Sequence, residues 1–289
     1  MAKEIDFSAR YGIAPGKKLN LAKTGPNEDG GLDGKAAVSA RLDECRERLH
    51  NFQVRLYAER KRAVLVCLQG MDSSGKDSVI NHVFSAVDLM GCEVTSFKKP
   101  SELEMGHDFL WRHHQAMPAR GMIGLHNRSH YEAVVIERVQ KIVDEKTCKR
   151  RIAEINAFEL MLSNAGITII KFFLHISKDE QLVRFKARLD DPLKHWKIGE
   201  ADFDQRERWD DNLAAYEDAI AATSTAHAPW YIIPANRKWY RDLAISEIMT
   251  ATLEKLAIPE PEPQADIDKL RKRYRIEEAA GVSALKAKK

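Results

Sequence analysis

The sequence of 289 residues lacks the features that mark secreted, membrane-spanning or disulfide-rich proteins. It has only four cysteines, widely spaced and without a C-x-x-C pair, so neither a zinc site nor a disulfide framework is expected. No segment approaches the run of about 18 apolar residues that a membrane-spanning helix needs. The first residues also contain no apolar signal core, so we expect a cytoplasmic protein.

An excess of one charge is missing as well. The 46 Lys and Arg residues nearly balance the 43 Asp and Glu residues, which leaves a net charge of +3. This surplus is too small to predict binding to nucleic acid or to a membrane surface. Hydrophobic residues make up 44% and charged residues 31%, which excludes a disordered chain. Any binding of a polyanion must therefore come from local clusters of basic residues.

Strand and helix patterns alternate along most of the chain. Residues 63–69 form a short apolar, β-branched run, typical of a strand buried on both faces of a parallel sheet. Further strands are expected at 92–97, 121–126, 167–176 and 230–233. Helices are expected at 35–62, 75–90, 101–115, 130–143, 148–163, 178–189, 202–223 and 236–256. This order predicts an α/β fold with a parallel sheet of about five strands flanked by helices.

Composition changes near both ends suggest three regions. Residues 1–35 hold scattered Gly, Pro and Lys, and we expect an irregular N-terminal arm. Residues 36–258 would form the α/β domain. Residues 259–289 begin with a Pro-rich linker and continue as a charged tail, for which we expect a peripheral helix or disorder.

A phosphate-binding loop follows the first predicted strand. The spacing G-x-x-x-x-G-K at residues 70–76 lies between a strand and a helix, which is the context of a Walker A loop. Such a loop turns backbone amides toward one anion at a helix N-terminus. The alternative is a glycine turn that only joins strand to helix. The residues expected to bind phosphate are Gly70, Ser73, Ser74, Gly75, Lys76 and Asp77.

The loop departs from the usual motif in one position. Asp77 stands where a Ser or Thr hydroxyl normally binds magnesium, and Ser78 comes one residue too late. Asp72, inside the loop, could supply a carboxylate for the metal instead.

A second polar cluster follows the strand predicted at 121–126. Arg128 is suited to gripping phosphate oxygens with two parallel hydrogen bonds. Asn127 occupies the place of the acidic Walker B residue, and Glu132 could supply the missing negative charge. The alternatives are a salt bridge at a helix start for Arg128 and a solvated helix position for Glu132. Carboxyl ends of parallel strands share one edge of the sheet, so this cluster should face the loop.

A lid is predicted over about residues 184–210, which would complete a P-loop kinase fold of the thymidylate kinase type. Arg184 and Arg188 lie four residues apart and share a helix face, and Lys194 and Lys197 follow around Pro192. Kinases of this fold close such a lid over phosphates to exclude water. The alternative is a surface hairpin held by salt bridges.

These and other motifs, in this order, resemble the polyphosphate kinase 2 family over roughly residues 40 to 258. The segments that carry the resemblance are LQGMDSSGKDS (68–78), FKKPS (97–101), HDFLWR (107–112), HNRSHYEAVVIERV (126–139), RFKARLDDPLKHWK (184–197), RERWDD (206–211) and APWY (228–231) with Lys238. The wording of the third and fourth segments is most similar to the class III branch. Serines 73 and 74 depart from the alanines common in the family, and Val-Asp-Leu-Met at 87–90 departs from Val-Asn-Pro-Gln.

The resemblance implies a Mg²⁺-dependent, reversible transfer of the terminal phosphoryl group of polyphosphate to nucleoside mono- and diphosphates. Mn²⁺ is the alternative ion. The assembly it implies is a homo-oligomer, either a dimer or a tetramer. Its catalytic residues would be Asp72, Lys76, Arg128 and Glu132, with Asp72 and Glu132 at the metal. The acceptor nucleotide would bind at Asn127, Arg128 and Glu132. Polyphosphate would run along the lid cations Arg184, Arg188, Lys194 and Lys197.

Two other functions remain open from the residues alone. An ATP-dependent nucleoside monophosphate kinase would share the loop, lid and sheet. A non-catalytic P-loop protein that binds polyanions would account for the unusual Asp77 and the neutral Asn127.

Overall fold

The computed structural model describes residues 5–286. Residues 1–4 and 287–289, the outer ends of the predicted arm and tail, lie outside this range. The chain divides into two units, Met1–Ile258 and Pro259–Lys289. The first contains the sheet and all predicted site residues, and the second is a linker followed by helix α12 (Ile267–Lys286).

Five parallel strands form one sheet in the order β2-β3-β1-β4-β5, which confirms the predicted fold class. The strands are β1 (Ala63–Gln69), β2 (Cys92–Ser96), β3 (Ile123–Asn127), β4 (Ile167–His175) and β5 (Trp230–Pro234). Every residue of β1 is buried, as its continuous apolar run predicts for a central strand. The chain passes from β1 to the edge strand and returns to both sides of β1. The carboxyl ends of β1 and its neighbours therefore border the crevice where parallel α/β sheets bind ligands.

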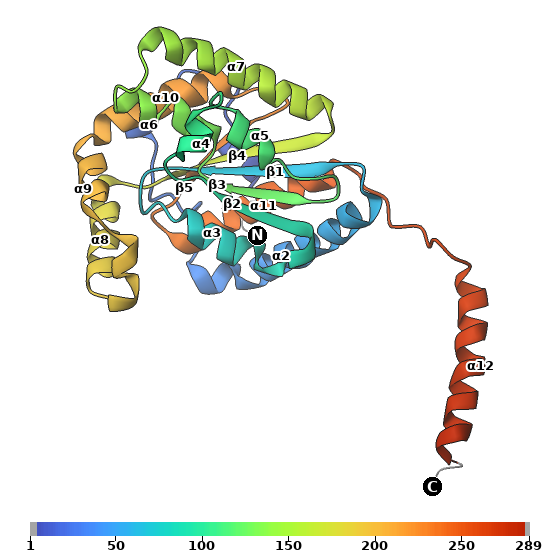
Figure 1. The fold of residues 1–289 in the computed structure, drawn as a ribbon. Coiled ribbons are helices and arrows are strands. Elements are labelled where there is room, and N and C mark those ends of the chain that lie inside the picture. Colours follow the sequence, from blue (N-terminus) through green and yellow to red (C-terminus); the bar gives the residue numbers. More distant parts are fainter. Residues whose placement is uncertain (1–4, 287–289) are drawn as a thin grey trace. The chain divides into compact units, whose positions relative to one another are not determined.

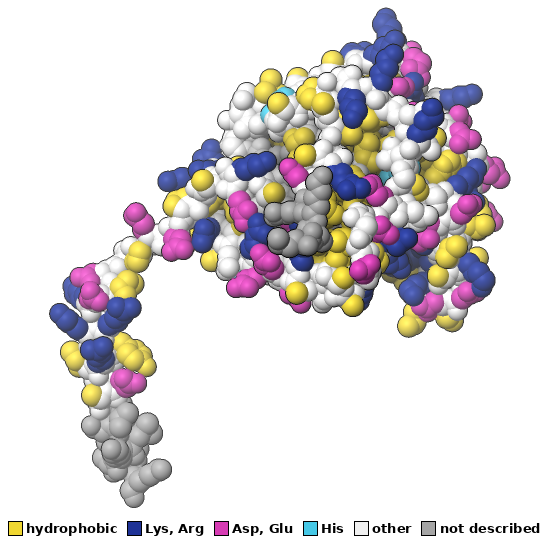
Figure 2. Space-filling model, turned by 180° about the vertical axis from the view of Figure 1, so that it is seen from behind, with side chains coloured by type: hydrophobic (Ala, Val, Ile, Leu, Met, Phe, Trp, Pro, Cys, Tyr) yellow, Lys and Arg dark blue, Asp and Glu magenta, His cyan; other side chains and the backbone are white. Residues whose placement is uncertain are grey.

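Helices cover both faces of this sheet (Figure 1). Those on one face are α2 (Lys35–Glu59), α3 (Lys76–Val83) and α11 (Lys238–Glu254). Those on the other include α7 (Glu145–Asn164) and α10 (Trp209–Thr223). The side chain of Asp144 begins α7 by accepting a hydrogen bond from the Thr147 amide at 2.7 Å. On the face seen in Figure 2, basic and acidic side chains are interspersed, in keeping with the small net charge.

Four helices predicted as continuous are broken in the structure. The segment 75–90 forms α3 and then two 3₁₀ turns, at Phe84–Ala86 and Leu89–Gly91. The segment 101–115 forms α4 (Glu102–Met105) and α5 (Trp111–Gln115), and 202–223 is divided at Arg208 into α9 (Glu200–Glu207) and α10. The segment 130–143 forms a 3₁₀ turn, His130–Ala133, and the short α6 (Ile136–Val139). Most residues from 129 to 135 are buried, whereas an amphipathic helix would bury only one face, so packing overrides the local preference.

The N-terminal arm is less irregular than predicted. It contains α1 (Phe7–Tyr11) and a 3₁₀ turn at Leu21–Lys23. Phe7, Tyr11 and Leu21 are buried in the main core. The Tyr11 and Tyr240 hydroxyls lie 2.6 Å apart, which ties the arm to α11. The arm is thus part of the α/β unit rather than a loose extension.

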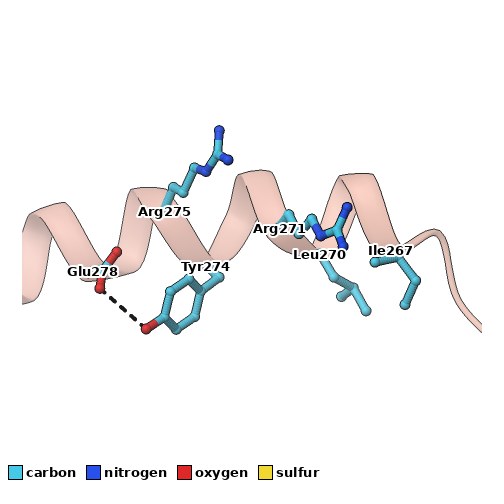
Figure 3. Close-up of a pocket in the computed structure, with 6 residues that line it drawn as sticks. All are labelled: Ile267, Leu270, Arg271, Tyr274, Arg275 and Glu278. Atoms are coloured by element: carbon cyan, nitrogen blue, oxygen red, sulfur yellow. Dashed lines mark hydrogen bonds between the residues drawn. The ribbon is translucent and has the colours of Figure 1, made fainter.

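The second unit consists largely of one amphipathic helix. A shallow pocket on α12 is lined by its own side chains alone: Ile267, Leu270, Arg271, Tyr274, Arg275 and Glu278 (Figure 3). None of the predicted site residues belongs to it. A search of the described helices finds none with the length and apolar character needed to cross a bilayer.

Candidate active site

The phosphate-binding loop leaves β1 at Gln69 and enters α3 at Lys76. Gly70 and Gly75 have φ angles of 147° and 103°, values that side chains disfavour. Ser73 has a φ of 64°, an uncommon conformation for a residue other than glycine. Strained backbone of this kind persists only where the surrounding structure enforces it, and it gathers at functional sites. The strand–loop–helix context predicted for the phosphate loop is therefore present.

Lys76 is the first residue of α3, and its side chain folds back onto the loop. Its Nζ donates hydrogen bonds to the carbonyl oxygens of Gly70 at 2.9 Å and Met71 at 3.3 Å. Burial lowers the pKa of Lys76 to about 8, and the nearby Arg128 cation adds to this effect. An anion bound in the loop would favour the protonated ammonium and reverse the shift.

Arg128 joins the second polar cluster to the loop. Its Nη2 donates to Asp72 Oδ1 at 2.7 Å and its Nη1 to Glu132 Oε2 at 3.3 Å. Burial opposes the charge of Arg128, but the two carboxylates outweigh it and raise its pKa above the ordinary value. Arg128 also has a φ of 64°. The structure thus brings the four predicted catalytic residues together at the ends of the neighbouring strands β1 and β3.

Asp77 explains the departure of the loop from the common motif. Its two carboxylate oxygens accept hydrogen bonds from Asn127 Nδ2 at 2.7 Å and Lys197 Nζ at 3.2 Å. Burial raises the pKa of Asp77, but these two hydrogen bonds and the charges of Lys197 and Lys76 together outweigh it and leave the pKa below the ordinary value. The residue at the usual hydroxyl position therefore links the end of β3 to the lid.

The lid cations lie on α8 (Lys178–Leu189) and on a 3₁₀ turn at Pro192–Lys197. Arg188 donates to the Lys197 carbonyl at 2.6 Å and lies 3.8 Å from Asp202. Lys194 is exposed and pairs with Asp191 at 2.6 Å. Arg188, Lys194 and Lys197 therefore share one segment, and each lies within 4 Å of a carboxylate.

Arg184 differs from the other predicted lid cations. Its side chain is only 10% exposed, and Nε donates to Glu180 at 2.8 Å. The remaining hydrogen bonds go to backbone carbonyls, those of Ser73, Ser74, Ala235 and Asn236. Each guanidinium nitrogen of Arg184 is engaged by protein groups beside the loop, so this residue does not lie free along a polyphosphate path.

Sequence reasoning did not identify two buried polar contacts of the loop. Gln181 Nε2 donates to the Asp72 carbonyl at 2.9 Å, and the Tyr216 hydroxyl donates to Gln69 Oε1 at 3.2 Å. Gln181 lies three residues before Arg184, on the same face of α8, which is the one signal the sequence offered. Tyr216 had no such signal, because α10 meets the loop only through tertiary folding.

The residues of the cluster fit a divalent cation completed by substrate. No group of three or more His, Cys, Asp or Glu side chains within residues 5–286 could hold a metal alone. Mg²⁺, however, is commonly bound by one or two carboxylates together with substrate phosphates. Asp72 and Glu132 supply two carboxylates that converge on one guanidinium.

A family model described as "Polyphosphate kinase 2 (PPK2)" matches residues 33–261. The chain belongs to the polyphosphate kinase 2 family. This confirms the resemblance found in the motifs.

Two curated relatives and one solved structure match most of this chain. An "AMP/ADP-polyphosphate phosphotransferase" of Meiothermus ruber is 44% identical over 262 residues, covering 90% of this chain and 98% of the relative. An "ADP-polyphosphate phosphotransferase" of Rhodopseudomonas palustris is 40% identical over 265 residues, covering 88% and 92%. The crystal structure of polyphosphate kinase 2 from Arthrobacter aurescens TC1 superposes with a TM-score of 0.88 at 40% identity, covering 94% of this chain and 97% of that one.

The pKa of Lys76 predicts how phosphate binding changes with pH. Below about 8 the ammonium is protonated and attracts an anion, and above it the amine is neutral. We expect the association constant for inorganic tripolyphosphate to fall in the wild type, relative to a Lys76→Met variant, as pH rises through about 8. Calorimetric titrations of both proteins across this range measure the ratio, and the variant corrects for the titration of the ligand. A ratio that stays constant into alkaline solution would contradict the assignment.

Proposed function

We propose that this protein transfers the terminal phosphoryl group of inorganic polyphosphate to AMP and ADP with the help of Mg²⁺. The observation that carries the proposal is the near full-length similarity to the Meiothermus ruber enzyme together with the assembled cluster of Asp72, Lys76, Arg128 and Glu132. The same cluster speaks against a binding protein without catalysis, because it joins two cations and two carboxylates at the end of a phosphate loop.

Phosphoryl transfer asks for positioning and charge neutralisation more than for acid–base chemistry. The second ionisation of a phosphate monoester lies at about pH 6, so a nucleotide phosphate is already ionised at neutral pH and needs no strong base. The N-terminus of α3 supplies amides for the donor phosphate, and Lys76 and Arg128 supply positive charge for oxygens in transfer.

Asp72 and Glu132 would hold the Mg²⁺ ion, which when bound neutralises charge on the phosphates. Arg128 now binds both carboxylates, so it places its guanidinium where donor, acceptor and metal would meet. The lid residues Arg188 and Lys194, with Lys197, supply cations for the remaining phosphates of the chain.

The reaction is tested by incubating the protein with long-chain polyphosphate, Mg²⁺ and either AMP or ADP, and separating the nucleotides by chromatography. We expect ADP and ATP to form from AMP, and ATP from ADP, with loss of polyphosphate. ATP and AMP without polyphosphate provide the control for an ATP-dependent kinase. The proposal would be contradicted if AMP were phosphorylated to ADP faster with ATP as the donor than with polyphosphate. It would also be contradicted if the amount of polyphosphate stayed unchanged.

Replacing the two charged residues of the loop should abolish most of the rate. We expect Lys76→Ala and Asp72→Asn each to lower kcat/KM for polyphosphate by about 100-fold or more, the scale of losing a preorganised group that acts on developing charge. Lys186→Ala serves as the control, because this lysine is exposed on α8 and, among the described residues, forms an ion pair with Asp190 alone, at 2.6 Å. A folded Lys76→Ala variant with near-wild-type turnover would contradict the role of Lys76.

A further inference from the structure

Two arginines lie behind the phosphate loop, on the side of Gly75 where a side chain would stand. A Cβ atom added to Gly75 would clash with Arg241 Nη1 and would lie 3.6 Å from Arg184 Nη1. Arg241 lies on α11 and Arg184 on α8, helices that are separate in the sequence. Both guanidinium groups thus meet at the last loop residue before Lys76.

Arg184 fixes the direction of two loop peptides. Its Nη1 donates to the carbonyl oxygens of Ser73 and Ser74, both at 2.9 Å. The peptide bonds are trans, so the C=O and N–H of one peptide unit point in opposite directions. The carbonyl of Ser74 faces Arg184, and the Gly75 amide that shares its peptide unit must therefore point to the other side of the loop. Within residues 5–286 this amide donates no hydrogen bond.

Arg241 fills the space that Gly75 leaves open. Its side chain is completely buried. Nε and Nη2 donate to Asp242 Oδ1 at 2.8 Å and 2.6 Å, and Nη2 also donates to Ser78 Oγ at 3.0 Å. Nη1, the nitrogen against Gly75, is buried without a partner among the described residues. A buried donor without a partner costs free energy, and such a group in a folded protein indicates a structural or functional role. Because Nη1 lies against Gly75, that role concerns the phosphate loop.

We propose that Arg184 and Arg241 are positioning residues for phosphoryl transfer, acting as a brace that holds the free Gly75 amide toward the donor phosphate. This inference rests on the proposed function. It assigns Arg184 to the back of the loop rather than to the polyphosphate path, and it gives Arg241 a role that its position in α11 did not suggest. The brace acts on the phosphate in transfer, so its effect should not depend on the length of the polyphosphate.

Donors of different length distinguish a residue that positions the loop from one that binds along the polyphosphate chain. We compare Arg184→Lys with Arg188→Lys, a matched change four residues along α8, using tripolyphosphate and long-chain polyphosphate as donors for ADP. A lysine keeps the charge but cannot bridge all the carbonyls that Arg184 reaches. We expect Arg184→Lys to lower kcat by about 100-fold, the scale of a misplaced reacting group, by the same factor for both donors. Its KM should rise only modestly and to the same extent for both donors. Arg188→Lys should instead raise KM, and more for the long chain.

Two results would overturn the brace: wild-type kcat in Arg184→Lys, or a rise in KM that grows with chain length as for Arg188→Lys.

Arg241 is tested by the double variant Arg241→Met with Asp242→Asn, which leaves no buried charge unpaired, against Asp242→Asn alone. The double variant should lose kcat equally for both donors while its thermal melting stays cooperative. Wild-type kcat in the folded double variant would remove Arg241 from the brace.

A binding measurement keeps this test apart from that of the proposed function. An inactive wild type would refute the proposed function. The role of Arg184 in the loop would still be tested by measuring how far tripolyphosphate raises the melting temperature. This rise should be smaller in Arg184→Lys than in the wild type, and an equal rise would overturn the inference.

Discussion

A phosphate loop can offer its amide hydrogens to a ligand only if the carbonyls of the same peptides find partners on the opposite side. In this protein that requirement is met by side chains behind the loop. Arg184 donates hydrogen bonds to the carbonyls of Ser73 and Ser74, and Gln181 donates one to the carbonyl of Asp72. These contacts fix the direction of three loop carbonyls. The Ser74 amide donates to the Met71 carbonyl at 3.0 Å, and the Gly75 amide is left without a partner among the described residues.

The site also shows how a chain of small net charge can receive a polyanion. Three cations of the site are paired with carboxylates: Arg128 with Asp72 and Glu132, Lys197 with Asp77, and Arg188 with Asp202. A chain of phosphates would replace carboxylates as the partner of these cations. The cations are therefore already in position, and their cost of burial in the free protein is reduced.

Sequence alone predicted the parts of the structure that depend on local pattern. The central strand at 63–69 and the helix at 178–189 were predicted with the bounds that the structure shows. The strand can be recognised because it is a continuous apolar run, buried along its whole length. Glycine spacing likewise located the phosphate loop. The segment 130–143 was predicted as a helix and is not one, because it is buried on several sides. The contacts of Arg184 and Asp77 were not predictable, since the i, i+4 spacing and the motif position say nothing of what α8 and the start of α3 face in the folded chain.

The central claim is that one cradle, formed by the start of α3 with Lys76 and Arg128, holds the end of the polyphosphate. A crystal structure of the protein with tripolyphosphate and Mg²⁺ tests this most directly. We predict a terminal phosphate on the amides of Gly75 and Lys76, within hydrogen-bond distance of Lys76 Nζ and Arg128, with the rest of the chain toward Lys197. A triphosphate bound elsewhere, with Lys76 still on the carbonyls of Gly70 and Met71, would contradict the claim.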